Sequence, residues 1–193
     1  MEQLTLGISE KSETIIIADG LNGFRIELVK KIGSNDISEL IDVSEVLVKK
    51  YSESAKLTKK TITKYFNKNT FPFIARYNNK IIGYIIGVPL EYFRKEGWAH
   101  YDKNLGECNT IYTYAFVVKE KFQKRGGYSK SLKKIYLNWV RKQNYNFITG
   151  HTELGIAKNF SSDTETVKIF PEWYGSKVSF EYYRRPIKKE ISS

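Results

Sequence analysis

Residues 116–132, FVVKEKFQKRGGYSKSL, place two adjacent glycines and a cluster of positive charge between segments of different periodicity. A run of β-type apolar residues precedes the glycines, and apolar residues at helical spacing follow them. Gly126 and Gly127 let the main chain approach a ligand without obstruction by a Cβ atom. The first N–H groups of the following helix, and the positive end of its dipole, point to the same place. The stretch therefore predicts an anion site suited to a pyrophosphate, with Lys124 and Arg125 adding charge at its mouth.

Two better-known phosphate-binding motifs do not fit this loop. It lacks the Gly-Lys-Ser/Thr ending of a Walker loop, and the GxGxxG spacing of dinucleotide-binding folds is absent. A two-glycine turn is weak support by itself, and the alternative is a tight basic turn with no ligand. The secondary structure expected on either side of the loop helps to distinguish these two interpretations.

The flanking segments predict the elements that would position this loop. Strands are expected at residues 24–32, 71–77, 80–93, 109–118, 144–152 and 177–187. Helices are expected after an N-cap at Asp36, across 57–67, directly after the two glycines and, as a short helix, near 164–170. Asn78-Asn79 joins two of the strands as a hairpin, because asparagine tolerates the positive φ of such turns. In residues 1–23 the segment ETIIIADG predicts one further strand. This order predicts an α+β domain around a mixed sheet.

Composition limits the class of protein. A chain of 193 residues fits one domain of ordinary size, and its 41% hydrophobic and 15% aromatic content argues against disorder throughout. The apolar runs, such as 81–90, are too short to span a bilayer, so no membrane partner is expected. The N-terminus has no pattern of a secretion signal. A single cysteine, Cys108, fits a reducing interior, so the expected location is the cytoplasm.

The net charge of +11 raises the alternative of a nucleic-acid-binding protein. Most of the basic residues are lysines, however, and they are spread along the chain rather than gathered into one tract. No aromatic-basic RNA motif or recognition helix stands out. The charge is therefore interpreted mainly as solvated surface, and a nucleic-acid partner is disfavoured.

The glycine stretch resembles the signature of the GNAT N-acetyltransferases, in which a strand leads to Gln/Arg-x-x-Gly-x-Gly/Ala and a helix. Phe116 and Val118 match the apolar pair that ends the strand, and Phe122 matches the usual aromatic residue. Gln123 matches the first residue of the motif and Gly126 its central glycine. The order of elements from about residue 24 to 185 is also similar to that family.

The resemblance implies a GNAT-like, mostly antiparallel sheet with flanking helices and a splayed parallel strand pair that holds acetyl-CoA. It places the acetyltransferase domain at 24–187, between an N-terminal extension at 1–23 and a tail at 188–193. The backbone of Phe116, Val117 and Val118 would hold the acetyl and pantetheine groups. Residues 124–129, which end in Tyr128 and Ser129, would wrap the pyrophosphate. Tyr128 departs from the family, which has a small residue there, and Gly127 would supply the flexibility instead.

Acetyl transfer to an amine needs a neutral nucleophile, and an amine with a pKa of about 10.4 loses roughly 4–5 kcal/mol at pH 7 to protonation. Holding thioester and amine together can supply roughly 7–11 kcal/mol without a covalent enzyme intermediate. Several GNAT enzymes carry a glutamate base on the strand before the motif, where this chain has Tyr112. Strand alternation places Tyr112 on one face with Tyr114, Phe116 and Val118. Tyr112 can order a water or pack on the sheet, and His151, at the end of the next strand, is catalytic or an ordinary sheet-edge histidine.

The general acid of the family is often a tyrosine on the short C-terminal helix. A loose alignment puts Phe170 at that position and Asp163 where the family often has asparagine. Tyr174, four residues after Phe170, is then the candidate proton donor to the CoA thiolate, and the alternative is an aromatic plug against the sheet. Cys108 is interpreted as structural rather than nucleophilic, and no metal site is expected.

Three functions stay open at this point. The first is an N-acetyltransferase that moves an acetyl group from acetyl-CoA directly to an unidentified primary amine in a ternary complex. The second is a catalytically weak acyl-CoA-binding sensor, which the missing glutamate and Phe170 favour. The third is the basic nucleic-acid-binding protein. The expected partners are acetyl-CoA and an amine acceptor, and a homodimer is compatible with all of these.

Overall fold

The computed structural model describes residues 9–124 and 126–188, and within them eight strands form one sheet in the order β1-β2-β3-β4-β5-β6-β8-β7. The strands are β1 (Glu13–Asp19), β2 (Phe24–Lys31), β3 (Phe71–Tyr77), β4 (Lys80–Pro89), β5 (Thr110–Val118), β6 (Phe147–Glu153), β7 (Glu165–Phe170) and β8 (Phe180–Pro186). Neighbouring strands are antiparallel except for the β5–β6 pair, which is parallel. The predicted α+β class with a mixed, mostly antiparallel sheet is confirmed.

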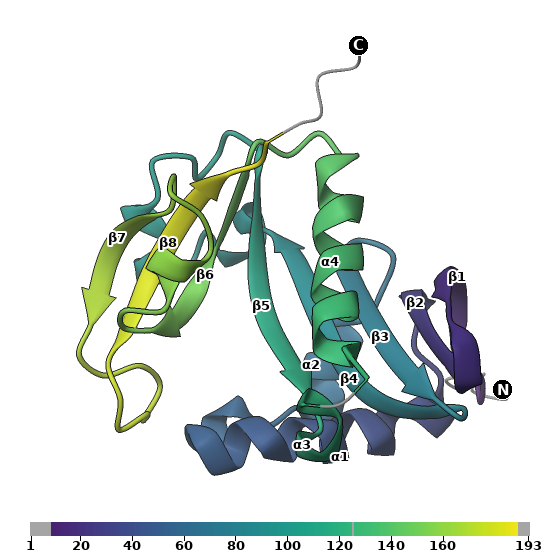
Figure 1. The fold of residues 1–193 in the computed structure, drawn as a ribbon. Coiled ribbons are helices and arrows are strands. Elements are labelled where there is room, and N and C mark those ends of the chain that lie inside the picture. The colour runs from purple at the N-terminus through teal and green to yellow at the C-terminus, as the bar shows by residue number, and fades with distance from the viewer. Residues whose placement is uncertain (1–8, 125, 189–193) are drawn as a thin grey trace, which may run out of the picture.

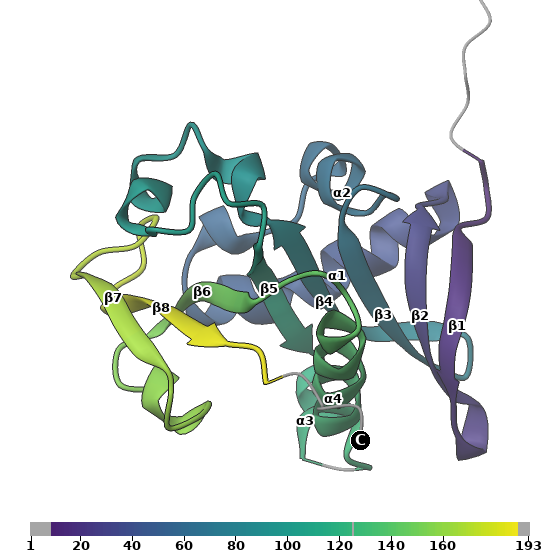
Figure 2. The same cartoon turned by 90° about the horizontal axis from the view of Figure 1, so that it is seen from above.

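Helices cover both faces of this sheet. They are α1 (Ser34–Lys50), α2 (Lys59–Tyr65), α3 (Glu120–Gln123) and α4 (Tyr128–Arg141), with short 3-10 turns at 21–23, 53–55, 90–93, 97–101 and 157–159. Viewed from above, α1, α2 and the segment 90–108 lie on one side of the sheet, and α3 and α4 lie on the other (Figure 2). We call these the α1 face and the α4 face. Within the described ranges no helix has the length and apolarity needed to cross a membrane.

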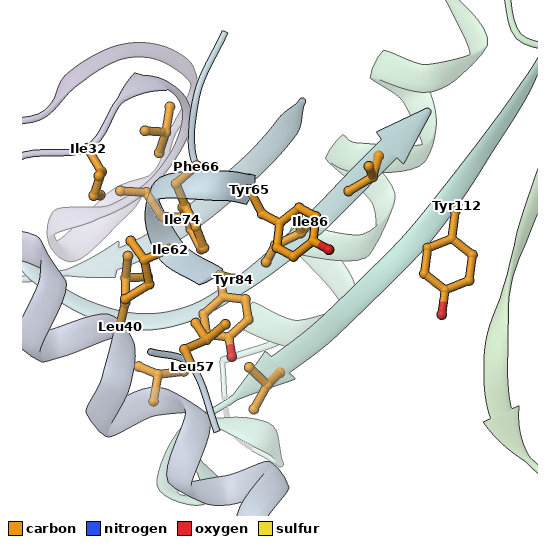
Figure 3. Close-up of a cluster of buried hydrophobic side chains, with 14 of the residues drawn as sticks. Ile32, Leu40, Leu57, Ile62, Tyr65, Phe66, Ile74, Tyr84, Ile86 and Tyr112 are labelled. Atoms are coloured by element: carbon orange, nitrogen blue, oxygen red, sulfur yellow. The ribbon is translucent and has the colours of Figure 1, made fainter. Parts of the chain in front are cut away.

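Each face of the sheet has its own apolar core. On the α1 face, Leu40 and Ile62 from the helices are fully buried against the sheet residue Tyr84, and Figure 3 shows these side chains between the helices and the strands. On the α4 face, the expected helical stripe buries Leu132 and Tyr136 on the sheet. Residues spaced three and four apart share one side of a helix, so these stripes dock each helix in one orientation.

Several predicted elements are confirmed. The hairpin between β3 and β4 turns through Asn78 and Asn79 with φ of 48° and 65°, the left-handed values that asparagine tolerates. The ETIIIADG segment forms β1, which pairs with β2 and is part of the same sheet. The predicted N-cap was wrong: α1 begins at Ser34, and Asp36 lies in its first turn, where its carboxylate binds the guanidinium of Arg76.

The short helix predicted near 164–170 was also wrong. These residues form β7, which pairs antiparallel with β8 as the outer strand of the sheet. The segment TVKIF contains β-branched residues that favour an extended chain, and β8 offers it a free edge to pair with. Phe170 ends this strand, so the helical alignment that compared it with the family's tyrosine does not hold.

A β-bulge interrupts the alternation of β5. Ala115 pairs with Ile86 and Thr113 pairs with Gly87, so Tyr114 is an extra residue without a direct partner. As a result Tyr112, Tyr114 and Val117 contact the core of the α1 face, while Val118 belongs to the core of the α4 face. The prediction that Tyr112 shares a face with Phe116 and Val118 was therefore wrong, because the extra residue reverses the parity beyond it.

Candidate active site

The parallel strands β5 and β6 separate part of the way along the sheet. Their ladder runs from Thr110 paired with Phe147 to Thr113 paired with Gly150, and β5 then continues alone on that side to Val118. Figure 1 shows the two strands together at one end and apart at the other. A cavity of about 590 Å³ occupies this region, and its lining residues come from both faces of the sheet. The gap thus connects the two faces at the bulge of β5.

The α4 face of the cavity carries positive charge. It is lined by Lys133 and Tyr136 from α4, by Tyr183 and Arg185 from β8 and by Phe160. The Nζ atom of Lys133 lies 4.7 Å and the Cζ atom of Arg185 lies 5.6 Å from the centre of the Phe160 ring. Burial, together with the nearby charge of Arg185, lowers the pKa of Lys133. The buried Nε of Arg185 has no hydrogen-bond partner among the described residues.

The α1 face of the cavity has the opposite character. Its wall contains aromatic rings from four parts of the chain: Tyr51, Tyr65, Phe93, Trp98, Tyr112, Tyr114, Trp173, Tyr174 and Phe180. The ring centres of Tyr65 and Tyr114 lie 4.2 Å apart, and those of Trp98 and Tyr112 lie 4.8 Å apart. Among the described residues that line the cavity, Glu96 supplies the carboxylate. This half is therefore aromatic with one negative charge.

Tyr112 and His151 meet in this wall. The phenol oxygen of Tyr112 lies 2.9 Å from Nδ1 of His151, and the imidazole stacks on Trp173 with ring centres 3.5 Å apart. Burial lowers the pKa of His151 to about 2, and it raises the pKa of Tyr112 above its usual range. Both groups are therefore neutral at pH 7. The buried Nε2 of His151 has no partner in the described part of the chain.

Tyr174 lies at the mouth of the aromatic half, in the loop between β7 and β8. Its side chain is exposed, its φ is 47°, and its carbonyl oxygen accepts hydrogen bonds from Ser52 and Ser54. Its hydroxyl donates to Glu96 over 3.4 Å. The loops around 53, 96 and 174 therefore meet at this opening.

The predicted phosphate loop has the expected backbone. Gly126 and Gly127 are exposed and both have a φ of 66°, and Gly127 caps α4. The Nε2 atom of Gln123 donates to the carbonyl oxygen of Val118 over 2.7 Å, which ties the start of the motif to the end of β5. A Cβ on Gly127 would meet no side chain of the described residues within 4 Å, so the loop is open at this glycine in front of the first turn of α4, where anions are stabilised.

Tyr128 does not block this loop. Its ring packs against Phe24, Tyr77 and Phe122, with ring centres 4.8, 5.6 and 5.7 Å away. A Cβ on Gly126 would lie 2.5 Å from an atom of this ring. The tyrosine that departs from the family pattern therefore supports the underside of the loop.

The other predicted ligand-binding residues fall into two groups. Phe116 lines the cavity, whereas the side chains of Val117 and Val118 are buried in the two cores, so these valines can offer only their backbone. Lys124 is exposed and Ser129 half-buried near the start of α4, outside the cavity. Arg125 lies outside the described residues. No group of three metal-binding side chains occurs among residues 9–124 and 126–188.

Several lining residues were not found from the sequence. Glu96 and Trp98 lie in a loop between two strands, and Trp173 lies in another, so no periodicity connects them. Tyr183 and Arg185 could have been grouped, because alternate residues of β8 point to one face. Cys108, interpreted as structural, is an exposed free thiol.

Comparison with solved structures shows which known fold the chain has. No protein-family model matches the chain, and no curated protein matches it in sequence. Among solved structures, the ribosomal-protein-S18-alanine N-acetyltransferase from Escherichia coli is 12% identical with a TM-score of 0.60, over 88% of this chain and 97% of that chain. Ard1 from Thermoplasma volcanium is 13% identical with a TM-score of 0.59, over 86% and 99%. A GNAT-family acetyltransferase from Streptococcus pneumoniae is 11% identical with a TM-score of 0.60, over 86% and 99%. The chain therefore has the fold of the GNAT acetyltransferases.

Proposed function

We propose that the protein is an N-acetyltransferase that moves an acetyl group from acetyl-CoA to a primary amine by direct transfer in a ternary complex. The observation that carries this proposal is the cavity between β5 and β6, which opens to a cationic wall on the α4 face and to an aromatic wall with one carboxylate on the α1 face. Acetyl-CoA is anionic and most amines are cationic in water. Each substrate therefore has a half of the cavity that suits its charge.

The residues present fit acetyl-CoA on the α4 face. The exposed glycines of the 124–129 loop and the first N–H groups of α4 would bind the pyrophosphate. Lys124 adds charge outside the cavity, while Lys133 and Arg185 add charge inside it. Among the described residues, no strand pairs with the β6-facing edge of β5 beyond Thr113, so backbone groups there would bind an extended pantetheine arm.

In the transfer step, the amine nitrogen attacks the carbonyl carbon of the thioester, a C–N bond forms and the C–S bond breaks. The nitrogen gives up a proton and the departing sulfur must be protonated or stabilised. Placing both substrates at one gap in the sheet supplies most of what this reaction needs. At the buried end of the cavity, beside Tyr112 and His151, the reacting amine loses hydration, which favours its neutral, nucleophilic form.

The buried imidazole of His151 is a weak base. With a pKa of about 2, holding a proton at pH 7 would cost roughly 7 kcal/mol. We therefore assign His151, with Tyr112, to orienting the amine or a water molecule. The proton of the amine then passes to solvent through that water.

Two phenols are candidates for protonating the thiolate. Tyr174 is the one that the sequence indicated, and it lies at the mouth of the aromatic half with its hydroxyl on Glu96. Tyr183 lines the α4 side of the cavity, and burial raises the pKa of its phenol, which keeps the proton available. Phenylalanine at each position removes only the hydroxyl, so the larger fall in kcat identifies the donor.

The test of the proposal has two stages. Thermal unfolding with and without acetyl-CoA measures binding, and release of free CoA thiol in the presence of a panel of primary amines measures transfer. We expect acetyl-CoA to raise Tm and at least one amine to accelerate thiol release. A rise in Tm with no amine-dependent release would instead support the acyl-CoA sensor, and no rise in Tm would contradict both functions.

A further inference from the structure

We propose that the amine acceptor carries a second positive charge, as a diamine or polyamine does, and that the aromatic half of the cavity with Glu96 binds that second charge. This inference rests on the proposed acetyltransferase function and adds the class of acceptor. It follows from which side chains line the α1 face of the cavity and from where the one carboxylate lies among them.

The wall is built mainly from π faces and edges. Tyr174 lies 4.8 Å from Trp173, and Tyr65 lies 4.2 Å from Tyr114, both between ring centres. Such rings attract a cation within about 6 Å of their centres, by roughly 0.5–2 kcal/mol for each contact according to how far water is excluded. An ammonium group that enters this wall is therefore attracted from several sides.

Glu96 gives this wall its charge. Its carboxylate accepts a hydrogen bond from Tyr174, and its negative charge adds to burial in raising the pKa of both Tyr65 and Tyr174. It is the acidic residue among the described residues that line the cavity, and the basic residues there, Lys133 and Arg185, belong to the α4 face. A cation on the α1 face thus gains a counter-charge, whereas an acceptor with a carboxylate would meet like charge.

The position of Glu96 distinguishes the second charge from the reacting amine. The reacting nitrogen must reach the gap in the sheet, next to Thr113 and Tyr114, where β5 and β6 separate. Glu96 and Tyr174 instead lie at the outer opening, where the loops around 53 and 174 meet. An acceptor that extends from the gap to the mouth therefore places its far end, not its reacting end, beside Glu96.

The experiment compares matched amines by kcat/KM in the thiol-release assay. The panel contains 1,4-diaminobutane, the neutral analogue 4-aminobutan-1-ol, the anionic analogue 4-aminobutanoate and the apolar amine 2-phenylethylamine. We expect the diamine to exceed the amino alcohol by at least tenfold, with 4-aminobutanoate the poorest acceptor. Equal values for diamine and amino alcohol, or a preference for 2-phenylethylamine, would overturn the inference while leaving the acetyltransferase function in place.

The variant Glu96→Gln keeps the shape of the side chain and removes its charge. We expect it to lose most of the preference for 1,4-diaminobutane over 4-aminobutan-1-ol, chiefly through KM. The matched control is Glu107→Gln, an exposed carboxylate of the same long loop that does not line the cavity, and it should keep the preference. A preference that survives in Glu96→Gln would assign the selectivity to another group and contradict the proposal.

A binding measurement separates the inference from the reaction. Trp98 and Trp173 line the cavity, so their fluorescence should change when 1,4-diaminobutane is titrated into the protein in the presence and absence of CoA. We expect a saturable change in the wild-type protein that is weakened at least fivefold in Glu96→Gln. If the diamine gives no such change, the inference fails. If the change occurs but no amine accelerates thiol release, the cation site stands and the proposed transfer fails.

Discussion

His151 illustrates at the scale of one residue how packing sets chemistry. A histidine at the end of a strand beside a cleft suggests acid–base catalysis at neutral pH. In the structure its ring is stacked on Trp173 and joined to Tyr112, and burial lowers its pKa to about 2. The sequence could place this residue near the cleft, but it could not show the aromatic wall that removes its charge.

The lowered pKa of His151 makes stability depend on pH. The pKa of His151 is about 2 in the folded protein and about 6.5 in the unfolded chain. Below pH 6.5 the unfolded chain therefore binds a proton that the folded protein does not, so stability that is fully present above pH 6.5 is lost as pH falls. Each pH unit should cost about 1.4 kcal/mol at most. We expect His151→Asn to lose less unfolding free energy than the wild type between pH 7.5 and pH 5.5, as measured by urea unfolding.

The control for this prediction is the other histidine of the chain, the exposed His100. His100→Asn should retain the pH dependence of the wild type. An identical loss of stability in His151→Asn and in the wild type would show that the imidazole stays hydrated or charged in the folded protein.

Substitutions at Gly127 test the proposed phosphate loop, because two variants can be compared there that differ only in charge. The φ of 66° at Gly127 favours Gly, Asn and Asp over other residues, and a Cβ there would lie more than 4 Å from every described residue other than its chain neighbours. Gly127→Asn and Gly127→Asp therefore impose the same backbone strain and differ by one negative charge. By calorimetric titration we expect the aspartate variant to bind acetyl-CoA about tenfold or more weakly than the asparagine variant. Equal affinities would place the pyrophosphate elsewhere.

At the scale of elements, α1 is fixed to the sheet by a buried ion network. Arg76 of β3 donates to both oxygens of Asp36 over 3.0 and 2.5 Å and lies 3.2 Å from Glu27 of β2. Burial alone would raise the pKa of Asp36, but hydrogen bonds from Arg76 and Ser12 outweigh it and lower the pKa. The stability that this carboxylate contributes is therefore present above about pH 4 and is lost as pH falls further.

Asp36→Asn should destabilise the fold at pH 7. The change leaves Arg76 with Glu27 as its remaining carboxylate partner, and we expect a loss of about 1–3 kcal/mol in the free energy of unfolding. The control is Glu45→Gln, because the Glu45–Lys56 pair is exposed on both sides and should contribute less than about 1 kcal/mol. Similar losses in both variants, measured by urea unfolding, would contradict a special role for the buried network.

Two elements show where local sequence patterns stop being informative. The strand–glycine–helix unit of β5 and α4 could be predicted, because periodicity and backbone freedom are local properties. The bulge at Tyr114 could not, because it depends on the pairing of β5 with β4. Strand β7 was mistaken for a helix because its partner β8 lies 10 residues further along the chain, and pairing of that kind overrides weak local preference.

At the scale of the whole molecule, the cavity joins a cationic wall on one face of the sheet to an aromatic wall with one carboxylate on the other. The fold class and the turn from β5 through the two glycines into α4 could be predicted, because one motif and the order of elements carry them. The aromatic wall could not be predicted, because its residues come from loops around residues 53, 96 and 174 as well as from strand β5. Loops far apart in sequence meet only after the sheet has formed, so no local pattern could predict this wall.

The positive charge on the α4 face should lower the stability of the free protein and, under the proposed function, favour the binding of acetyl-CoA. Lys133 is partly buried beside Arg185, and burial and that like charge lower its pKa. At pH 7 the charged lysine therefore costs folding free energy, and Lys133→Met should raise Tm by about 1–2 °C in the absence of ligand. The same change removes a charge from the half of the cavity assigned to acetyl-CoA, so affinity should fall roughly tenfold.

The matched control is Lys134→Met, which removes an exposed lysine from the neighbouring position of α4. It should leave Tm and acetyl-CoA affinity close to the wild-type values, because its charge is solvated and lies outside the cavity. Differential scanning calorimetry and isothermal titration measure the two quantities on the same samples. A Lys133→Met protein with a higher Tm and unchanged affinity would show that the cationic wall does not bind CoA. A lower Tm would show that the contact of the Lys133 ammonium with the Phe160 ring stabilises the fold by more than burial of the charge opposes it.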